Sequence, residues 1–225
     1  NKVMVERFLS QTSFTSQEDF IKNLKINVPE NFNFGFDVVD AWAEAEPEKK
    51  ALVWCDEEDN EKIFTFTDIK QLSNKAANFF KSLGVKKGSV VMLILRRRWE
   101  YWVCATALHK IGAILIPGTL QLTKKDIVYR GNAAKVCAVV CVNDPFVMEQ
   151  VEAAQGDIPT LKNKILVAER REGWLDLNEE MEKFSDEFPR PAGEEATRWD
   201  DTMLVYFTSG TTGMPKICLL YTSPS

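Results

Sequence analysis

Hydrophobic and polar positions along most of the chain repeat with the periods of strands and helices. From Val90 onward, short apolar runs rich in β-branched residues take turns with segments whose apolar positions fall at helical spacing. This rhythm predicts right-handed strand–helix–strand units, and hence an α/β fold with a mostly parallel sheet covered by helices. The predicted strands are Val90–Leu95, Ala113–Pro117, Val136–Val142, Lys164–Val167 and Met203–Phe207, and the predicted helices are Trp99–Lys110, Thr123–Ala133, Pro145–Ala154 and Leu175–Phe184.

The first part of the chain has shorter segments. A modest helical pattern lies around Glu18–Leu24, and a clearer helix is predicted over Phe36–Glu46, where Pro47 stops it. Two short strands, Ala51–Trp54 and Ile63–Phe66, flank a charged turn. These segments precede the regular alternation of strands and helices.

A longer helix is predicted from Asp68 to Leu83. Its apolar residues form one stripe, which we interpret as a face packed on the core. Thr67 is predicted to be its N-cap. Gly84 is predicted to be the left-handed residue past its end, with Val85 making the apolar contact that often follows.

The composition is typical of a globular protein. The chain has 225 residues, of which 45% are hydrophobic and 27% are charged, and its net charge is −5. An acidic balance argues against a nucleic-acid binder, and no run approaches the ~20 apolar residues that span a bilayer. Arg96-Arg97-Arg98 is the one dense basic cluster. It indicates either a solvated strand end or attraction of an anionic ligand at the carboxyl edge of the sheet.

Cysteine and histidine usage favours a reducing compartment. The cysteines are Cys55, Cys104, Cys137, Cys141 and Cys218. They form no Cys-x-x-Cys pair and His109 is the sole histidine, so we predict no structural metal site. Cys137 and Cys141 are four apart in a strand and are predicted to point to one face as buried thiols. His109 is given a surface or capping role, and the protein is expected to be cytoplasmic.

The densest candidate chemistry follows the last predicted strand. The stretch Tyr206–Lys216 contains four Ser and Thr residues, two glycines and a lysine. Glycines let backbone N–H groups approach an anion, and hydroxyls and an ammonium donate to phosphate oxygens. The sequence therefore predicts a phosphate-binding loop, with a polar surface loop as the plain alternative. The candidate phosphate-binding residues are Thr208, Ser209, Gly210, Thr211, Thr212 and Gly213, and Lys216 is the candidate catalytic cation.

This stretch is not a Walker A loop, because Pro215 precedes the lysine and no Ser or Thr follows it. It resembles instead the signature loop of the adenylate-forming (AMP-binding) superfamily, which includes acyl-coenzyme A synthetases. Phe64–Ile69 and Ala107–Ile114 are similar to two further motifs of that superfamily, and Asn31–Phe34 looks most like its medium-chain acyl-CoA synthetases. The resemblance runs from about Val28 to Lys216 and implies the amino-terminal portion of the large adenylating domain.

The resemblance implies a ligase that uses ATP, Mg²⁺ and coenzyme A on a small-molecule carboxylic acid. Residues 208–213 would enclose the β- and γ-phosphates of ATP, with Lys216 at the edge of the loop. Gly118 and Thr119 follow a predicted strand, where the thiol arm of coenzyme A or the acyl chain would lie; a tight turn is the alternative. The magnesium ligands of the family lie downstream, so no metal ligand is assigned here.

Three segments are predicted. Residues 1–27 form an approach segment, 28–217 belong to the adenylating domain, and 218–225 are a non-native tail. The last prediction rests on Cys218–Ser225, whose residues match an in-frame read of a transposase sequencing adapter. The chain is accordingly predicted not to make acyl-AMP. The alternatives are an adenylation domain for amino or aryl acids, a non-catalytic nucleotide-binding module, and a P-loop phosphotransferase, which Pro215 disfavours.

Overall fold

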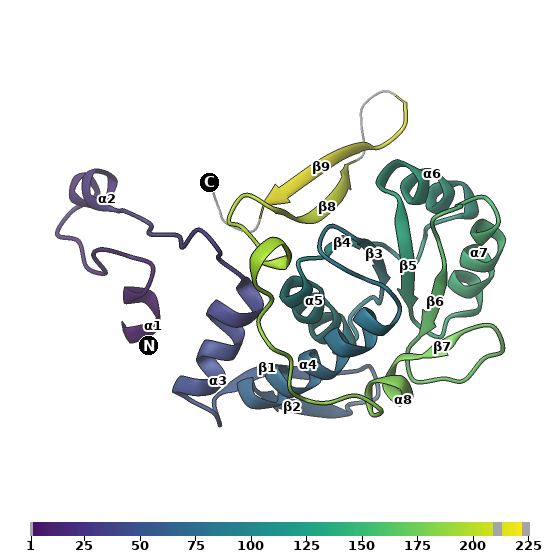
Figure 1. The fold of residues 1–225 in the computed structure, drawn as a ribbon, viewed down its shortest axis with the longest axis horizontal. Helices are drawn as coiled ribbons and strands as arrows, with labels where there is room; N and C mark the ends of the chain where they lie inside the picture. Colours follow the sequence, from purple (N-terminus) through teal and green to yellow (C-terminus); the bar gives the residue numbers. More distant parts are fainter. Residues whose placement is uncertain (1, 209–212, 222–225) are drawn as a thin grey trace.

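A computed structural model describes residues 2–208 and 213–221. Within these residues the fold is α/β, as the alternation predicted (Figure 1). The strands are β1 (Lys50–Cys55), β2 (Glu61–Thr65), β3 (Val90–Ile94), β4 (Ile114–Pro117), β5 (Val136–Cys141), β6 (Asn163–Leu166), β7 (Leu175–Asp176), β8 (Thr202–Thr208) and β9 (Lys216–Tyr221). The helices are α1 (Lys2–Glu6), α2 (Gln17–Asn23), the π-helical η1 (Gly35–Asp40), α3 (Ala41–Ala45), α4 (Phe66–Ser82), α5 (Glu100–Ile111), α6 (Lys124–Ala134), α7 (Pro145–Gln155), α8 (Leu177–Met181) and the 3₁₀ turn η2 (Gly193–Glu195).

The main sheet has the strand order β7-β6-β5-β3-β4-β8-β9. Neighbouring strands from β7 to β8 are parallel, and only the β8–β9 pair is antiparallel. Strands β1 and β2 pair separately as an antiparallel hairpin. The carboxyl ends of β3, β4 and β8 therefore meet at one edge, which is where open parallel sheets bind ligands.

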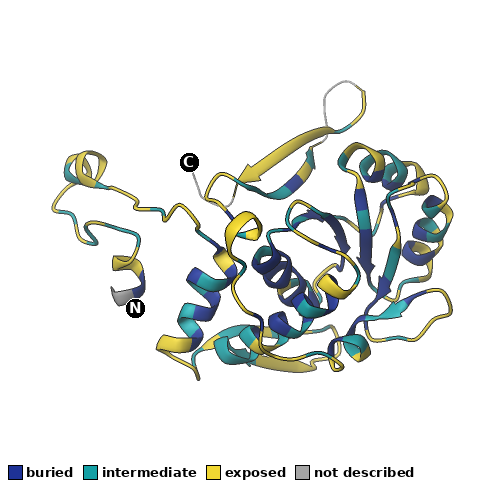
Figure 2. Cartoon of the chain, viewed as in Figure 1, coloured by how far each residue is buried: buried dark blue, intermediate teal, exposed yellow. Residues whose placement is uncertain are grey.

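Two apolar clusters fill the two faces of this sheet. Helices α4 and α5 contribute to the cluster that includes Leu93, and α6 and α7 line the cluster that includes Met92. All five residues of β3 are buried, because alternate side chains enter opposite clusters. In Figure 2 the central strands are dark blue, with α4 and α5 on one side and α6 and α7 on the other. Burial on both faces explains why β3 is apolar without alternation.

For the long helix α4, the structure confirms the predicted C-terminal end but not the predicted N-cap. Gly84 has φ of +83° and Val85 is buried, as expected. The N-cap is Thr65, whose hydroxyl accepts from the N–H of Asp68, while the Asp68 carboxylate accepts from the N–H of Thr65. The prediction of Thr67 was wrong because the reciprocal capping box begins two residues earlier and draws Phe66 into the helix.

Two predicted details of the later strands are also corrected. Cys137 packs against the α4–α5 cluster, whereas Cys141 is buried in the other one. A bulge opposite β3 adds one residue at Cys137, so the two thiols face opposite sides rather than one. The predicted helix Leu175–Phe184 begins as the short strand β7, because Leu175 and Asp176 pair with β6.

The N-terminal helices are joined to α5 by a buried ion pair. The Nζ of Lys110 lies 2.7 Å from Asp40 Oδ1 and donates to Asn74 Oδ1 at 2.6 Å. Burial lowers the pKa of Lys110 and raises the pKa of Asp40, and each charge offsets part of the effect on the other. In Figure 1, α1 and α2 lie to the left of α3, away from the main sheet.

Candidate phosphate-binding loop

The predicted loop connects the two strands of the β8–β9 hairpin. Thr208 is paired with Lys216 across the hairpin, so the two predicted ends of the loop face each other. Both residues are exposed. Gly213 has φ of +89°, a conformation that favours glycine. The predicted phosphate ligands Ser209, Gly210, Thr211 and Thr212 lie outside the described residues.

Position and chemistry at this hairpin suit an anion. Strand β8 runs parallel to β4, so Thr208 lies at the carboxyl edge of the sheet. Thr208 offers a hydroxyl and Lys216 an ammonium, and the ammonium forms no salt bridge within residues 2–208 and 213–221. These groups donate hydrogen bonds, which suits phosphate oxygens better than proton abstraction.

Helix α6 holds the base of the loop. The hydroxyl of Tyr129 donates to the carbonyl oxygen of Pro215 at 2.9 Å. The Tyr129 ring meets the Phe207 ring edge-on, with 6.1 Å between ring centroids. The Cζ of Arg130 lies 5.2 Å from the centroid of the same Phe207 ring. Sequence reasoning gave these two α6 residues no role at the loop. The contacts span about eighty positions of chain, and no local pattern signals such a distant partner.

The second predicted site follows β4, the parallel neighbour of β8. Gly118 follows β4, and its N–H donates to the carbonyl of Leu93 at 2.8 Å. A Cβ at Gly118 would lie 2.9 Å from Ile94 and 3.0 Å from Leu122, so close packing already accounts for the glycine. Thr119 is exposed and lies past the same strand.

The basic cluster after β3 is largely used by the fold. Arg98 donates two hydrogen bonds to the buried carboxylate of Glu100, at 2.6 and 3.0 Å. Arg96 pairs with the exposed Glu57 at 3.0 Å. Arg97 is exposed, and its carbonyl accepts from the indole N–H of Trp54. The structure therefore favours a strand end tied to its neighbours over a dedicated anion site.

His109, for which the sequence predicted a surface or capping role, is not fully exposed. Its ring is half-buried and meets Phe34 edge-on at 6.0 Å. Burial lowers the pKa of His109 from 6.5 to about 4. Its Nδ1 is buried and has no hydrogen-bond partner among the described residues. The imidazole is accordingly neutral at physiological pH.

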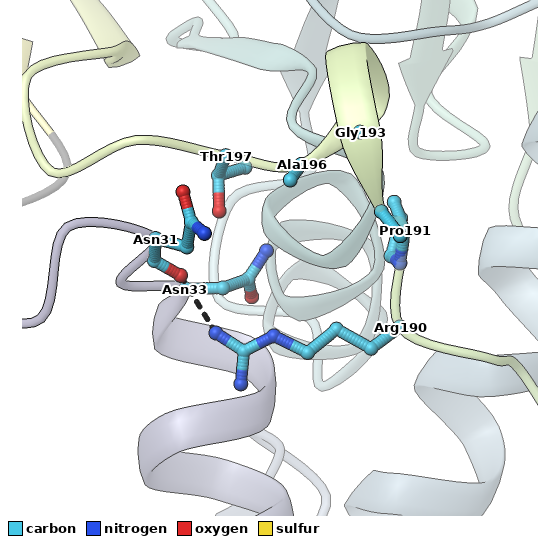
Figure 3. A pocket seen from close by; sticks show the side chains of 8 residues that line it. Asn31, Asn33, Arg190, Pro191, Gly193, Ala196 and Thr197 are labelled. Carbon is cyan, nitrogen blue, oxygen red and sulfur yellow. Dashed lines mark hydrogen bonds between the residues drawn. The ribbon is translucent and has the colours of Figure 1, made fainter.

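A separate cavity of about 270 Å³ lies beside the segment that leads to β8. It is lined by Asn31, Asn33, Arg190, Pro191, Ala192, Gly193, Ala196 and Thr197. Figure 3 shows Arg190 reaching toward Asn31, whose carbonyl accepts its hydrogen bond at 2.6 Å. The same guanidinium donates to both carboxylate oxygens of Asp37, at 2.7 and 2.8 Å. We interpret the cavity as a packing gap between residues 31–33 and residues 190–197.

The described residues, 2–208 and 213–221, show neither a metal-binding cluster nor a membrane-spanning helix. No group of three or more His, Cys, Asp or Glu side chains there could hold a metal ion. Among the helices of residues 2–208 and 213–221, none has the length and apolar character needed to cross a bilayer. The five cysteines are unpaired.

Comparisons with known proteins place the chain in a family. The model of the family described as AMP-binding enzyme matches residues 39–223. The mitochondrial acyl-coenzyme A synthetase ACSM3 of Mus musculus is 35% identical over 218 residues, which cover 94% of this chain and 37% of the relative. The mitochondrial acyl-coenzyme A synthetase ACSM4 of Rattus norvegicus is 38% identical over 197 residues, covering 84% of this chain and 33% of the relative.

A solved structure agrees with the fold. The crystal structure of the anthranilate CoA ligase AuaEII in complex with anthranoyl-AMP has a TM-score of 0.74 to this chain at 20% identity. The likeness covers 87% of this chain and 36% of that ligase, and at this identity it shows the fold alone. The chain spans 37% and 33% of the lengths of the mouse and rat relatives. Because the family model matches residues 39–223, the chain belongs to the AMP-binding enzyme family, as its sequence motifs predicted.

Proposed function

We propose that this chain is part of an ATP-dependent acyl-CoA synthetase and that its β8–β9 loop binds the phosphates of ATP. The observation that carries the proposal is the geometry at the mouth of the loop. Thr208 and Lys216 face each other, and Gly213 has a left-handed conformation. Family membership and the names of the mouse and rat relatives support the same reaction class.

The reaction that we propose for the whole protein has two steps. The carboxylate of the acid attacks the α-phosphorus of ATP, which forms acyl-AMP and releases pyrophosphate. The thiol of coenzyme A then attacks the acyl carbon, and AMP leaves. Negative charge moves onto the leaving pyrophosphate in the first step, so fixed hydrogen-bond donors and cations around it lower the barrier.

The residues of this chain serve the first step in the proposal. The hydroxyl and backbone donors of residues 208–213 enclose the β- and γ-phosphates, and the Lys216 ammonium neutralises charge at the edge of the loop. Thr119 offers an exposed hydroxyl for the arm of coenzyme A or the acyl chain, while Gly118 serves mainly to pack against Ile94. Within residues 2–208 and 213–221, no group of three or more His, Cys, Asp or Glu side chains could hold Mg²⁺.

We also propose a small carboxylic acid as the substrate, with acyl acids ahead of amino or aryl acids. The relatives are named acyl-coenzyme A synthetases, and the similarity to the anthranilate ligase carries no weight beyond fold. The unpaired cysteines favour a reducing compartment, and we propose the cytoplasm. The mouse and rat relatives are named as mitochondrial proteins.

Calorimetric titration of the chain with Mg·ATP tests the proposal. Lys216→Ala is expected to weaken binding by roughly 10- to 150-fold, since a charge-assisted hydrogen bond contributes about 1.5–3 kcal/mol. Lys22→Ala, on the exposed surface of α2, is the matched control because it removes the same charge away from the hairpin. Equal ATP affinity in both variants, or no binding by the unmodified chain, would contradict the proposal.

A further inference from the structure

The loop is attached to the body of the protein by α6 as well as by its own strands. Phe207 precedes Thr208 at the leading end of the loop, and Pro215 precedes Lys216 at the trailing end. Tyr129 contacts both of these flanking residues, through its ring and its hydroxyl. One side chain therefore bridges the two sides of the loop at its base (Figure 1 shows α6 beside the hairpin).

The helix that carries Tyr129 is itself firmly fixed. Its start is closed by a capping box between Thr123 and Asp126. Ile127, on the inner face of the helix, is fully buried. Gly131 lies so close to Ile158 that a Cβ would be 2.5 Å from that side chain, which shows tight packing after the tyrosine. A residue on such a helix can hold a partner in place.

Arg130 supports the same attachment from the next position. Its guanidinium lies over the Phe207 ring and interacts with Asp126 Oδ1 at 3.5 Å. Phe207 thus lies against two consecutive α6 side chains, whereas the contact of Pro215 with α6 is the hydrogen bond from Tyr129. The trailing end, which leads into Lys216, is held by this hydroxyl together with the β8–β9 pairing.

We infer that Tyr129 is a positioning residue for phosphate binding: its hydrogen bond to Pro215 fixes the trailing end of the loop and the direction in which Lys216 leaves it. The inference rests on the proposed function. A preorganised loop end loses less conformational freedom when it closes on a ligand, so the same donors bind phosphate more tightly. Tyr129 does not itself touch the nucleotide in this mechanism.

Tyr129→Phe isolates the hydrogen bond, because it keeps the ring against Phe207 and removes only the hydroxyl. Tyr206→Phe is the matched control, since Tyr206 is exposed on β8 and its hydroxyl forms no hydrogen bond in the described residues. The first readout is hydrogen exchange of the amides of residues 213–221. The second is affinity for Mg·ATP and for inorganic tripolyphosphate, and melting temperature reports global stability.

Tyr129→Phe is expected to speed exchange at 216–217 and to weaken both ligands by roughly fivefold, with little change in melting temperature, because one neutral hydrogen bond is lost. Tyr206→Phe should match the unmodified chain in all three. Unchanged exchange and affinity in Tyr129→Phe would overturn the inference while leaving the proposed function intact. If the unmodified chain binds neither ligand, the proposed function fails, and the positioning role fails with it.

Discussion

Strands β3 and β9 have similar apolar content but opposite surroundings. All five residues of β3 are buried, whereas all six residues of β9 are exposed. Strand β3 has parallel neighbours on both sides and helices on both faces. Strand β9 is the last strand of the sheet in the described residues, and it pairs with β8. Apolar residues therefore mark a strand, but the layers packed on it decide how much it stabilises the fold.

The two regions also differ in how they are held. The centre of the sheet is fixed by many apolar contacts that no single residue dominates. The end of the hairpin is held by its own strand pairing and by a few contacts from Tyr129 and Arg130. Local contacts of this kind can change without disturbing the core.

The largest expected effect tests the difference in burial. Leu93→Ala in β3 should lower the free energy of unfolding by about 3 kcal/mol, since the residue is 1% exposed and a cavity would remain. Leu219→Ala in β9, where the residue is 48% exposed, should change it by less than about 0.5 kcal/mol. Urea denaturation measures both. Similar losses in the two variants would remove the contrast between the regions.

A second pair of variants tests whether α6 is a rigid support. Gly131→Ala should cost about 1–3 kcal/mol, because its Cβ would meet the buried Ile158 at 2.5 Å. Gly156→Ala is the control, since no atom lies within 4 Å of its Cβ position and its φ is −64°. That substitution should be neutral or stabilise by about 0.4–1 kcal/mol. Equal effects would indicate that α6 packs loosely.

The third effect is smaller and depends on pH. The unfolded chain protonates His109 near its ordinary pKa of 6.5, whereas the folded chain resists protonation until about pH 4. The unfolded state binds more protons between these values, so stability falls as pH is lowered through this window. Between pH 7 and pH 5, the free energy of unfolding of His109→Gln should fall by about 1–2 kcal/mol less than that of the unmodified chain. The range is set below the full effect of the shift because the ring keeps part of its surface in water. Urea denaturation at each pH measures the stability of both proteins. Equal losses of stability in the variant and the unmodified chain would show that His109 is accessible to protons in the folded state.

Much of the scaffold could be predicted from sequence, because its signals are local. The apolar runs of β3 and β5 and the stripe of α4 identified the central strands and a covering helix. Errors arose where contacts distant in sequence decide the outcome. The bulge at Cys137 depends on pairing with β3, and the short β7 exists because β6 offers it an edge.

The candidate site divides in the same way. The mouth of the loop was predictable because glycine, hydroxyls and lysine lie together in the chain, and Thr208 and Lys216 do face each other. Tyr129 could not be found in this way, because only the tertiary fold brings α6 to Pro215. The phosphate-binding roles of residues 208–213 and the non-native origin of 218–225 stay predictions; Cys218–Tyr221 belong to β9.

Phosphorus NMR of Mg·ATP titrated with the chain tests the central claim most directly, because it reports each phosphate separately. If the β8–β9 loop encloses the end of the nucleotide, the β- and γ-phosphate resonances will shift or broaden more than the α resonance, and Lys216→Ala will reduce the change. Spectra that the chain leaves unaltered, or that change only at the α-phosphate, would contradict the claim.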